Sequence, residues 1–268
     1  MRVLMVGCGN MGFAVLKAWL DSGAVAAADA AVVEPGDAGR ERAAALGVET
    51  FAEAPSPDAF TADLVVLALK PQIMGDAAPA YRSFTDGGAA IMTIAAGLPI
   101  RFYEAMFGDN TPIIRVMPNT PAAIGEGMMA YIANEATTSE MVDQIRELLK
   151  ANGAVAELAS EEQMDGVTAI SGSGPAYLFH FLEALTAAGE QIGLEPDLAA
   201  LLARQTVLGA AKLAADGQTE PAELRRQVTS PNGTTAAGLA PMMEGDRLKS
   251  LMREAAEAAK RRSVELSR

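Results

Sequence analysis

Three glycines near the start of the chain have the spacing of a phosphate-binding loop. The stretch RVLMVGCGNMG places Gly7, Gly9 and Gly12 directly after a short apolar run and at the start of a helical pattern. In such a loop the first glycine makes a tight turn, the second lets a pyrophosphate approach the backbone, and the third lets the helix pack on the strand. The amides and positive dipole end of the helix then face the phosphates. The residues expected to contact a nicotinamide dinucleotide here are Gly7, Cys8, Gly9, Asn10, Met11 and Gly12.

An acidic residue follows at the distance expected for a ribose contact. Glu34 ends the second predicted strand, about 20 residues beyond the glycines. A carboxylate there accepts a hydrogen bond from the ribose 2′-hydroxyl and repels a 2′-phosphate, which favours NADH. Arg40 and Arg42 follow in the same loop and could pair with a phosphate. The sequence therefore leans to NADH and leaves NADPH open.

Three later loops should face the same cofactor, because ligands of open α/β sheets bind at the carboxyl ends of the strands. They are ALKPQ (68–72), IAAG (94–97) and VMPNTP (116–121). Each alone is ambiguous, since a lysine at a strand end is usually a surface residue. Together, at the ends of successive strands, they predict one rim. The rim residues expected at the cofactor are Ala68, Leu69, Lys70, Pro71, Ile94, Ala95, Ala96 and Asn119.

Two hydroxyl-rich turns interrupt the helical second half of the chain. ISGSGPAYLF (170–179) combines two serines and two glycines before a proline, and VTSPNGTT (228–235) combines Pro231, Asn232 and Gly233 with four hydroxyl side chains. Pro, Asn and Gly mark turns because of the φ values they favour. Both stretches can be simple helix starts with hydroxyl caps. Alternatively, their free amides and hydroxyls can bind a small anion such as a carboxylate.

The elements that carry these motifs divide the chain in two. Short apolar strands alternate with helices up to about residue 160, which predicts a parallel sheet covered on both faces. The strands are expected at 2–6, 31–34, 63–69, 89–95, 113–117, 128–133 and 154–158. Beyond that point long helices are expected at 175–192, 197–215 and 246–266. The predicted fold class is α/β, with a Rossmann-type dinucleotide-binding domain over 1–160 and an all-α domain over 161–268 that packs on itself or on a second copy.

Composition excludes several other classes of function. The formal net charge of −13 disfavours nucleic acid as a partner. The single cysteine, Cys8, excludes an intramolecular disulfide, and one cysteine with one histidine, His180, disfavours a zinc cluster, so no metal is expected. There is no signal-peptide pattern and no long uninterrupted apolar run, so we expect a cytoplasmic protein without a membrane span.

Taken in order, the motifs resemble those of the pyrroline-5-carboxylate reductase family, which performs the final step of proline biosynthesis. The matching stretches are GCGNMG, ALKPQ, IAAG, RVMPNTP, DGVTAISGSGPAY and VTSPNGTT, between residues 7 and 235. The resemblance implies an oxidoreductase that transfers a hydride from NADPH or NADH to the cyclic imine carbon of 1-pyrroline-5-carboxylate, forming L-proline. It also implies a homo-oligomer built through the C-terminal helical domain, as a homodimer or a decamer.

The resemblance further implies roles for individual residues. Ala68–Pro71 and Ile94–Ala96 match contacts on the nicotinamide side of the cofactor, and Thr235 matches the residue that hydrogen-bonds the ring nitrogen. One difference is that Asn232 stands where the family usually has glycine, although Asn tolerates positive φ. The residues implied at the substrate are Glu161, Gln227, Ser230, Gly233, Thr234 and Thr235.

Two other functions stay open at this point. A related reductase could act on another imine or on a hydroxy acid, although the segment SGSGPAYLFHFLEAL lacks the helix-borne lysine that hydroxy-acid enzymes use. A catalytically silent dinucleotide-binding protein would bind NAD(P)H without transferring hydride. An intact hydroxyl-rich turn argues against the silent protein.

Overall fold

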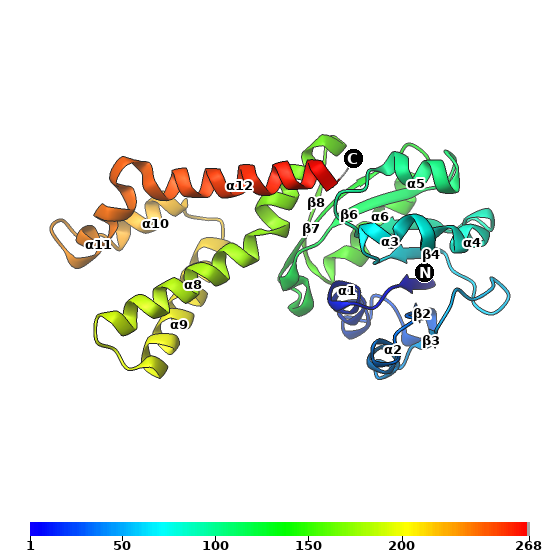
Figure 1. Ribbon diagram of the computed structural model, residues 1–268, viewed down its shortest axis with the longest axis horizontal. Coiled ribbons are helices and arrows are strands. Elements are labelled where there is room, and N and C mark those ends of the chain that lie inside the picture. Colours follow the sequence, from blue (N-terminus) through cyan, green and yellow to red (C-terminus); the bar gives the residue numbers. More distant parts are fainter. Residues whose placement is uncertain (267–268) are drawn as a thin grey trace. The chain divides into compact units, whose positions relative to one another are not determined.

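The computed structural model describes residues 1–266, which form two compact units. The first unit contains residues up to Ser173 together with the C-terminal residues from Ala259, and the second contains Gly174–Ala258 (Figure 1). Residues 161–173 therefore form part of the α/β unit and not of the helical unit. The domain boundary predicted at residue 160 stays a prediction.

The first unit is built on a single eight-stranded sheet with the order β3-β2-β1-β4-β5-β6-β7-β8. Neighbouring strands pair in parallel from β3 to β6, β7 is antiparallel to β6, and β8 is parallel to β7. The strands are β1 (Val3–Val6), β2 (Ala30–Val33), β3 (Glu49–Phe51), β4 (Leu64–Leu67), β5 (Ala90–Thr93), β6 (Ile113–Met117), β7 (Gly127–Ala133) and β8 (Gly153–Glu157).

All seven predicted strands are present, with bounds that differ by two residues or fewer at each end. Two expectations about the sheet were wrong. The short strand β3 was not predicted, and the sheet is not parallel throughout because β7 reverses direction. The reversal has a physical reason: only a short 3₁₀ segment, Thr120–Ile124, joins β6 to β7. A parallel crossover needs a dozen or more residues.

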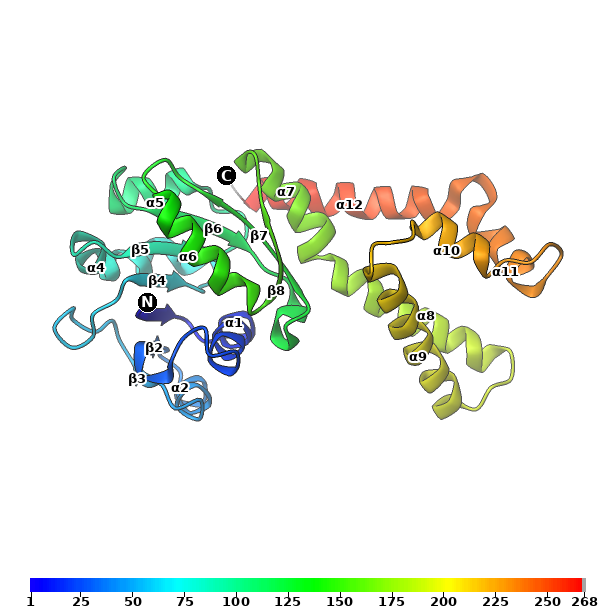
Figure 2. The ribbon, with the colours of Figure 1, turned by 180° about the vertical axis from the view of Figure 1, so that it is seen from behind.

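Helices cover both faces of this sheet, and alternate strand residues point to the two faces. On one face Val3 and Met5 pack with Trp19 of α1 and Leu149 of α6. Helix α6 lies in front of the sheet in Figure 2. On the other face Leu4 packs among residues from α3 to α5. The helices of this unit are α1 (Asn10–Asp21), α2 (Asp37–Ala44), α3 (Pro71–Ala77), α4 (Arg82–Asp86), α5 (Ile100–Phe107), α6 (Ser139–Lys150) and α7 (Met164–Val167).

The second unit is helical and exposes much of its apolar surface. Its helices are α8 (Gly174–Gln191), α9 (Pro196–Ala215), α10 (Pro221–Gln227), α11 (Thr234–Met243) and most of α12 (Arg247–Leu266). The three long helices predicted from the sequence are confirmed as α8, α9 and α12. Gly189 of α8 packs against Ala199 of α9, where a Cβ atom would lie 3.1 Å from the alanine Cβ. Large apolar side chains in this unit nevertheless face outward, among them Phe179, Leu201, Leu208, Leu213, Leu251 and Met252.

One helix among residues 1–266, α9, is long and apolar enough to cross a membrane by length and composition alone. Its mean hydropathy is 1.3 and 11% of its apolar window is buried. A single helix of this kind is weak evidence for a membrane span, because a helix that packs against other protein passes the same test.

We predict that Gly153→Ala destabilises the fold by about 1–3 kcal/mol, because a Cβ atom forces the packed β7–β8 pair apart. Gly153 has a φ of +136°, and a Cβ there would lie 2.5 Å from the amide nitrogen of Gly127. Gly75→Ala in α3 is the matched control, since its Cβ would meet nothing within 4 Å. Urea denaturation of both variants checks the prediction, and equal unfolding midpoints would contradict it.

Candidate functional site

The glycine loop has the backbone geometry that its sequence predicts. Gly7 follows β1 with a φ of +88°, and a Cβ there would lie 2.8 Å from the carbonyl oxygen of Ala68. Its amide donates to the carbonyl of Val33 at 2.8 Å, which ties the turn to the end of β2. A side chain at position 7 would therefore both strain the turn and push β1 away from β4.

Gly9 leaves open space at the start of α1, and Gly12 lets this helix start close to the sheet. A Cβ at Gly9 would meet nothing within 4 Å, whereas one at Gly12 would lie 2.5 Å from the carbonyl oxygen of Gly7. Gly9 is the N-cap of α1, and neither a side-chain cap nor an acidic residue occupies the first turn. The first amides of a helix have no intrahelical partner. This end of α1 therefore fits a pyrophosphate, with open space at Gly9 and free donors behind it.

Cys8 lies between Gly7 and Gly9, and its backbone hydrogen-bonds the residues that follow β2. Its amide donates to the Glu34 carboxylate, and its carbonyl accepts from the Arg42 guanidinium. The side chain is buried, and burial raises the pKa of the Cys8 thiol. The thiol is therefore protonated at neutral pH and packs as an apolar group.

The predicted rim residues follow the carboxyl ends of three adjacent parallel strands. Ala68, Leu69 and Lys70 follow β4, and Pro71 begins α3. Ile94–Ala96 follow β5, and Asn119 comes after β6. The chain leaves β1 for β2 on one side and later returns to β4 on the other, so the glycine loop lies where the strand order reverses. That is the position at which open α/β sheets bind ligands.

Asn119 connects the rim to the first hydroxyl-rich segment. Its Oδ1 accepts from the amide of Met128 at 2.9 Å, and its Nδ2 donates to Oγ of Ser171 at 3.3 Å. A helix that starts near Pro175 would be preceded by a non-helical loop, but the segment around Ser171 is not a loop. Residues Thr168–Gly172 form a π-helical turn between α7 and α8, with the Ser173 amide donating to the carbonyl of Thr168. The predicted start of a helix near Pro175 is confirmed, but the residues before it are helical too.

Glu161 forms an ion pair that the sequence analysis missed. Its Oε1 accepts from Nη1 of Arg115 at 2.7 Å and from the amide of Ile100, the first residue of α5, at 2.8 Å. The Arg115 side chain is 4% exposed and that of Glu161 29% exposed. The carboxylate thus neutralises a buried guanidinium and caps a helix. An arginine within the apolar strand IIRVM is the one sequence signal that could have indicated such a partner.

The second hydroxyl-rich segment, in the helical unit, is the turn that its sequence predicts. The amide of Gly233 donates to the carbonyl of Ser230 at 3.1 Å, which closes a four-residue turn. Asn232 has a φ of +58°, and a type II turn requires a positive φ at its third position. Gly233 is then the N-cap of α11, whose first turn holds Thr234 and Thr235 and carries no acidic residue or side-chain cap.

This turn and helix start present free donors at an exposed surface. Ser230, Thr234 and Thr235 are exposed, and a Cβ at Gly233 would collide with the Ser230 side chain. Gln227, at the end of α10, donates from Nε2 to Glu223 at 3.2 Å. The arrangement suits an anion small enough to reach the backbone at the start of α11.

Comparison with known proteins identifies the family. Residues 161–266 match the family model described as pyrroline-5-carboxylate reductase dimerisation, and residues 2–97 match that of coenzyme F420-dependent NADP oxidoreductases. The chain is 40% identical to a pyrroline-5-carboxylate reductase of Pseudomonas aeruginosa over 99% of its own length and 97% of the relative's. The chain belongs to the pyrroline-5-carboxylate reductase family.

Solved structures of this family share the fold along the whole chain. The Coxiella burnetii reductase superposes with a TM-score of 0.91 at 32% identity, covering 100% of this chain and 98% of that one. The Plasmodium falciparum reductase, solved with NADP bound, gives 0.86 at 28% identity and covers the same shares. The predicted family, fold class, enzyme class and NAD(P)H cofactor are confirmed.

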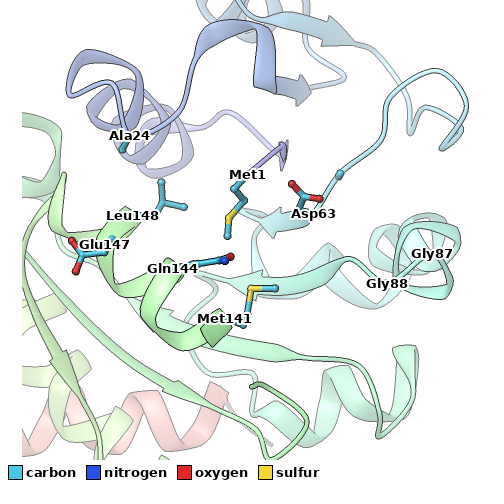
Figure 3. Close-up of a pocket in the computed structure, with 10 residues that line it drawn as sticks. Met1, Ala24, Asp63, Gly87, Gly88, Met141, Gln144, Glu147 and Leu148 are labelled. Carbon is cyan, nitrogen blue, oxygen red and sulfur yellow. The ribbon is translucent and has the colours of Figure 1, made fainter. Parts of the chain in front are cut away.

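A separate groove of about 720 Å³ lies at the amino ends of the strands, opposite the predicted cofactor loops (Figure 3). Asp63 and Gly88 line it just before β4 and β5, and Met141, Gln144 and Leu148 of α6 line its other side. None of the predicted site residues lies there. The loops in which the cofactor site is predicted follow the carboxyl ends of the strands, and this groove does not include them.

We predict that Gly9→Val lowers NAD(P)H affinity about 10-fold or more while the protein stays folded, because it fills the open side of the loop and removes charge-assisted amide bonds to the phosphates. Gly12→Val provides the contrast, since it collides with Gly7 and should lower both affinity and stability. Calorimetric titration with cofactor and thermal unfolding separate the two effects. Unchanged cofactor affinity in Gly9→Val would contradict the assignment of the loop.

We also predict that Glu161→Gln lowers the free energy of unfolding by about 3 kcal/mol, because it leaves the buried Arg115 guanidinium uncompensated. Glu157→Gln is the control, since Glu157 pairs with Arg146 at 3.2 Å on the surface, where such pairs contribute about 1 kcal/mol or less. Denaturant titration measures both. A loss in Glu161→Gln no larger than that in the control would show that the pair is not structural.

Proposed function

We propose that this chain reduces 1-pyrroline-5-carboxylate to L-proline, with the nicotinamide cofactor held at the glycine loop and strand ends of the first unit and the substrate held at the turn before α11. When bound, the nicotinamide supplies the hydride that adds to the imine carbon C5. The geometry of the Ser230–Thr235 turn is the observation that supports the proposed substrate site.

The substrate carboxylate is bound by the backbone at the start of α11. The amides there have no helical partner, and the positive end of the helix dipole favours an anion. Gly233 keeps this surface free of a side chain, and the hydroxyls of Ser230 and Thr234 add donors beside it. Charge-assisted bonds of this kind contribute about 1.5–3 kcal/mol each.

Thr235 orients the imine nitrogen of the substrate. A hydroxyl both donates and accepts, so it can hydrogen-bond the ring nitrogen and relay a proton from solvent. The cyclic imine is basic enough to be protonated near neutral pH, so no strong acid is needed beside it. Tyr103, which interacts electrostatically with Arg115 and Glu161, is a poor candidate for an acid that donates a proton to the imine. Burial raises the pKa of Tyr103 to about 12, and its hydroxyl is hydrogen-bonded to that of Thr93 at 2.7 Å.

Glu161 and Gln227 complete the proposed substrate contacts. Glu161 uses Oε1 for Arg115 and Ile100, while Oε2 receives no hydrogen bond from residues 1–266. That second oxygen is the group proposed to face a protonated ring nitrogen. The Gln227 amide is exposed at the end of α10, directly before the turn.

The proposal includes a homo-oligomer assembled through the helical unit. The match of residues 161–266 to a dimerisation family and the outward-facing apolar side chains of α8, α9 and α12 both support it. A second copy would remove this surface from water, which is favourable by roughly 25 cal/mol per Å² of apolar area. A cytoplasmic location belongs to the proposal as well, in keeping with the biosynthetic role of its relatives.

The activity is tested by supplying the purified protein with 1-pyrroline-5-carboxylate and either NADH or NADPH. Cofactor oxidation should match the L-proline formed. No turnover with either cofactor would refute the proposed function. Faster turnover of a six-membered cyclic imine would show that this larger imine, and not 1-pyrroline-5-carboxylate, is the preferred substrate.

We predict that Thr235→Ala lowers kcat/KM for the imine about 10- to 100-fold, the effect of one lost charge-assisted hydrogen bond, and leaves NAD(P)H affinity unchanged. Thr229→Ala is the control, because the Thr229 hydroxyl is already donated to the carbonyl of Arg225 at 2.6 Å. Steady-state kinetics and cofactor titration measure the two quantities. An equal loss of turnover and cofactor affinity would exclude a substrate-side role for Thr235.

A further inference from the structure

The Glu34 carboxylate is held at the mouth of the glycine loop by two backbone amides. Its Oε2 accepts from the Cys8 amide at 2.8 Å, and its Oε1 accepts from the Gly36 amide at 3.1 Å. A carboxylate oxygen can accept more than one hydrogen bond, so both oxygens keep the capacity to bind a donor. The carboxylate is therefore fixed beside the glycine loop, at the place where the fold type holds the ribose hydroxyls, and it can accept hydrogen bonds from them.

Gly39, in the first turn of α2, leaves room for this conformation of Glu34. A Cβ atom at position 39 would lie 2.6 Å from Cγ of Glu34 and 3.0 Å from its Cδ. Such distances are too short for carbon atoms, and the Glu34 side chain would have to turn away from the Cys8 amide. Neither φ nor backbone packing demands glycine here, because the atoms that a Cβ would meet belong to the Glu34 side chain.

The two arginines that could pair with a 2′-phosphate already have other partners. Arg40 donates from Nη1 to the carbonyls of Glu34 and Pro35, at 2.9 and 2.5 Å, and from Nη2 to Asp37. Arg42 donates to the carbonyl of Cys8, and its Cζ lies 4.4 Å from the centre of the Phe13 ring. Binding a phosphate through these donors would break bonds that hold the loop, and a phosphate bound by their remaining N–H groups would lie beside a carboxylate that repels it.

We propose that Gly39 is a positioning residue that makes this reductase selective for NADH over NADPH, because it allows Glu34 to stay against the Cys8 and Gly36 amides. The Plasmodium falciparum relative was solved with NADP bound, so membership of the family does not by itself predict a preference for NADH. The inference rests on the nicotinamide cofactor of the family and is independent of the substrate residues proposed above.

The test is calorimetric titration of the full-length protein with NADH and with NADPH, in the absence of any imine. The wild type should bind NADH about 10-fold tighter or more, the effect expected for charge-assisted bonds to the ribose hydroxyls. Gly39→Ala should bring the two dissociation constants within a few-fold of each other, mainly by weakening NADH. Gly36→Ala is the matched control, since its Cβ would lie 3.4 Å from Glu34 Oε1, an ordinary contact, and should keep the preference.

A double-mutant cycle shows whether Gly39 acts through Glu34. In the Glu34→Ala background, Gly39→Ala should not change the ratio of the two dissociation constants any further. Wild-type protein that binds NADPH as tightly as NADH would overturn the proposal, and so would a Gly39→Ala variant that keeps its preference. Selective NADH binding without imine turnover would refute the proposed function and leave this inference standing.

Discussion

The α1 helix can start against the sheet only because Gly12 has no side chain. A Cβ at that position would lie 2.5 Å from the carbonyl oxygen of Gly7 and 3.0 Å from the Ala68 side chain. This contact sets the position of the first turn of α1 and hence the direction in which its free amides point. It also joins β1 to the loop after β4, so that the glycine loop and the rim form one surface.

The same geometry recurs at the start of α11, where we propose that the substrate binds. Gly233 lies against the Ser230 side chain and carbonyl as Gly12 lies against Gly7, and in both places a bare backbone precedes a helix without a side-chain cap. One helix start suits a pyrophosphate and the other suits a carboxylate, because both ligands are anions and helix starts are electropositive. Under the proposed function both anions are bound mainly by backbone amides, and the chain's only histidine, His180, is exposed on α8.

Much of this could be predicted because the determinants are local. Gly7, Gly9 and Gly12 are close in sequence, the strands are short apolar runs, and Asn232 adopts the positive φ that its residue type allows. The reversal of β7 depends on the length of a connection, and the short strand β3 has only part of its surface buried. The Arg115–Glu161 pair joins residues that are remote in sequence, so only the buried arginine hinted at it. The π-helical turn before α8 depends on backbone bonds between residues five apart, such as that from Ser173 to Thr168, and residue types do not reveal these bonds.

Hydride transfer to the imine carbon is tested most directly by isotope labelling. The enzyme is given 1-pyrroline-5-carboxylate with a nicotinamide cofactor deuterated in the transferred position at C4, and the product is examined by mass spectrometry and NMR. The account predicts L-proline with one deuterium, bound to C5. Proline without deuterium, or deuterium at another carbon, would contradict direct hydride transfer from the cofactor to the imine carbon.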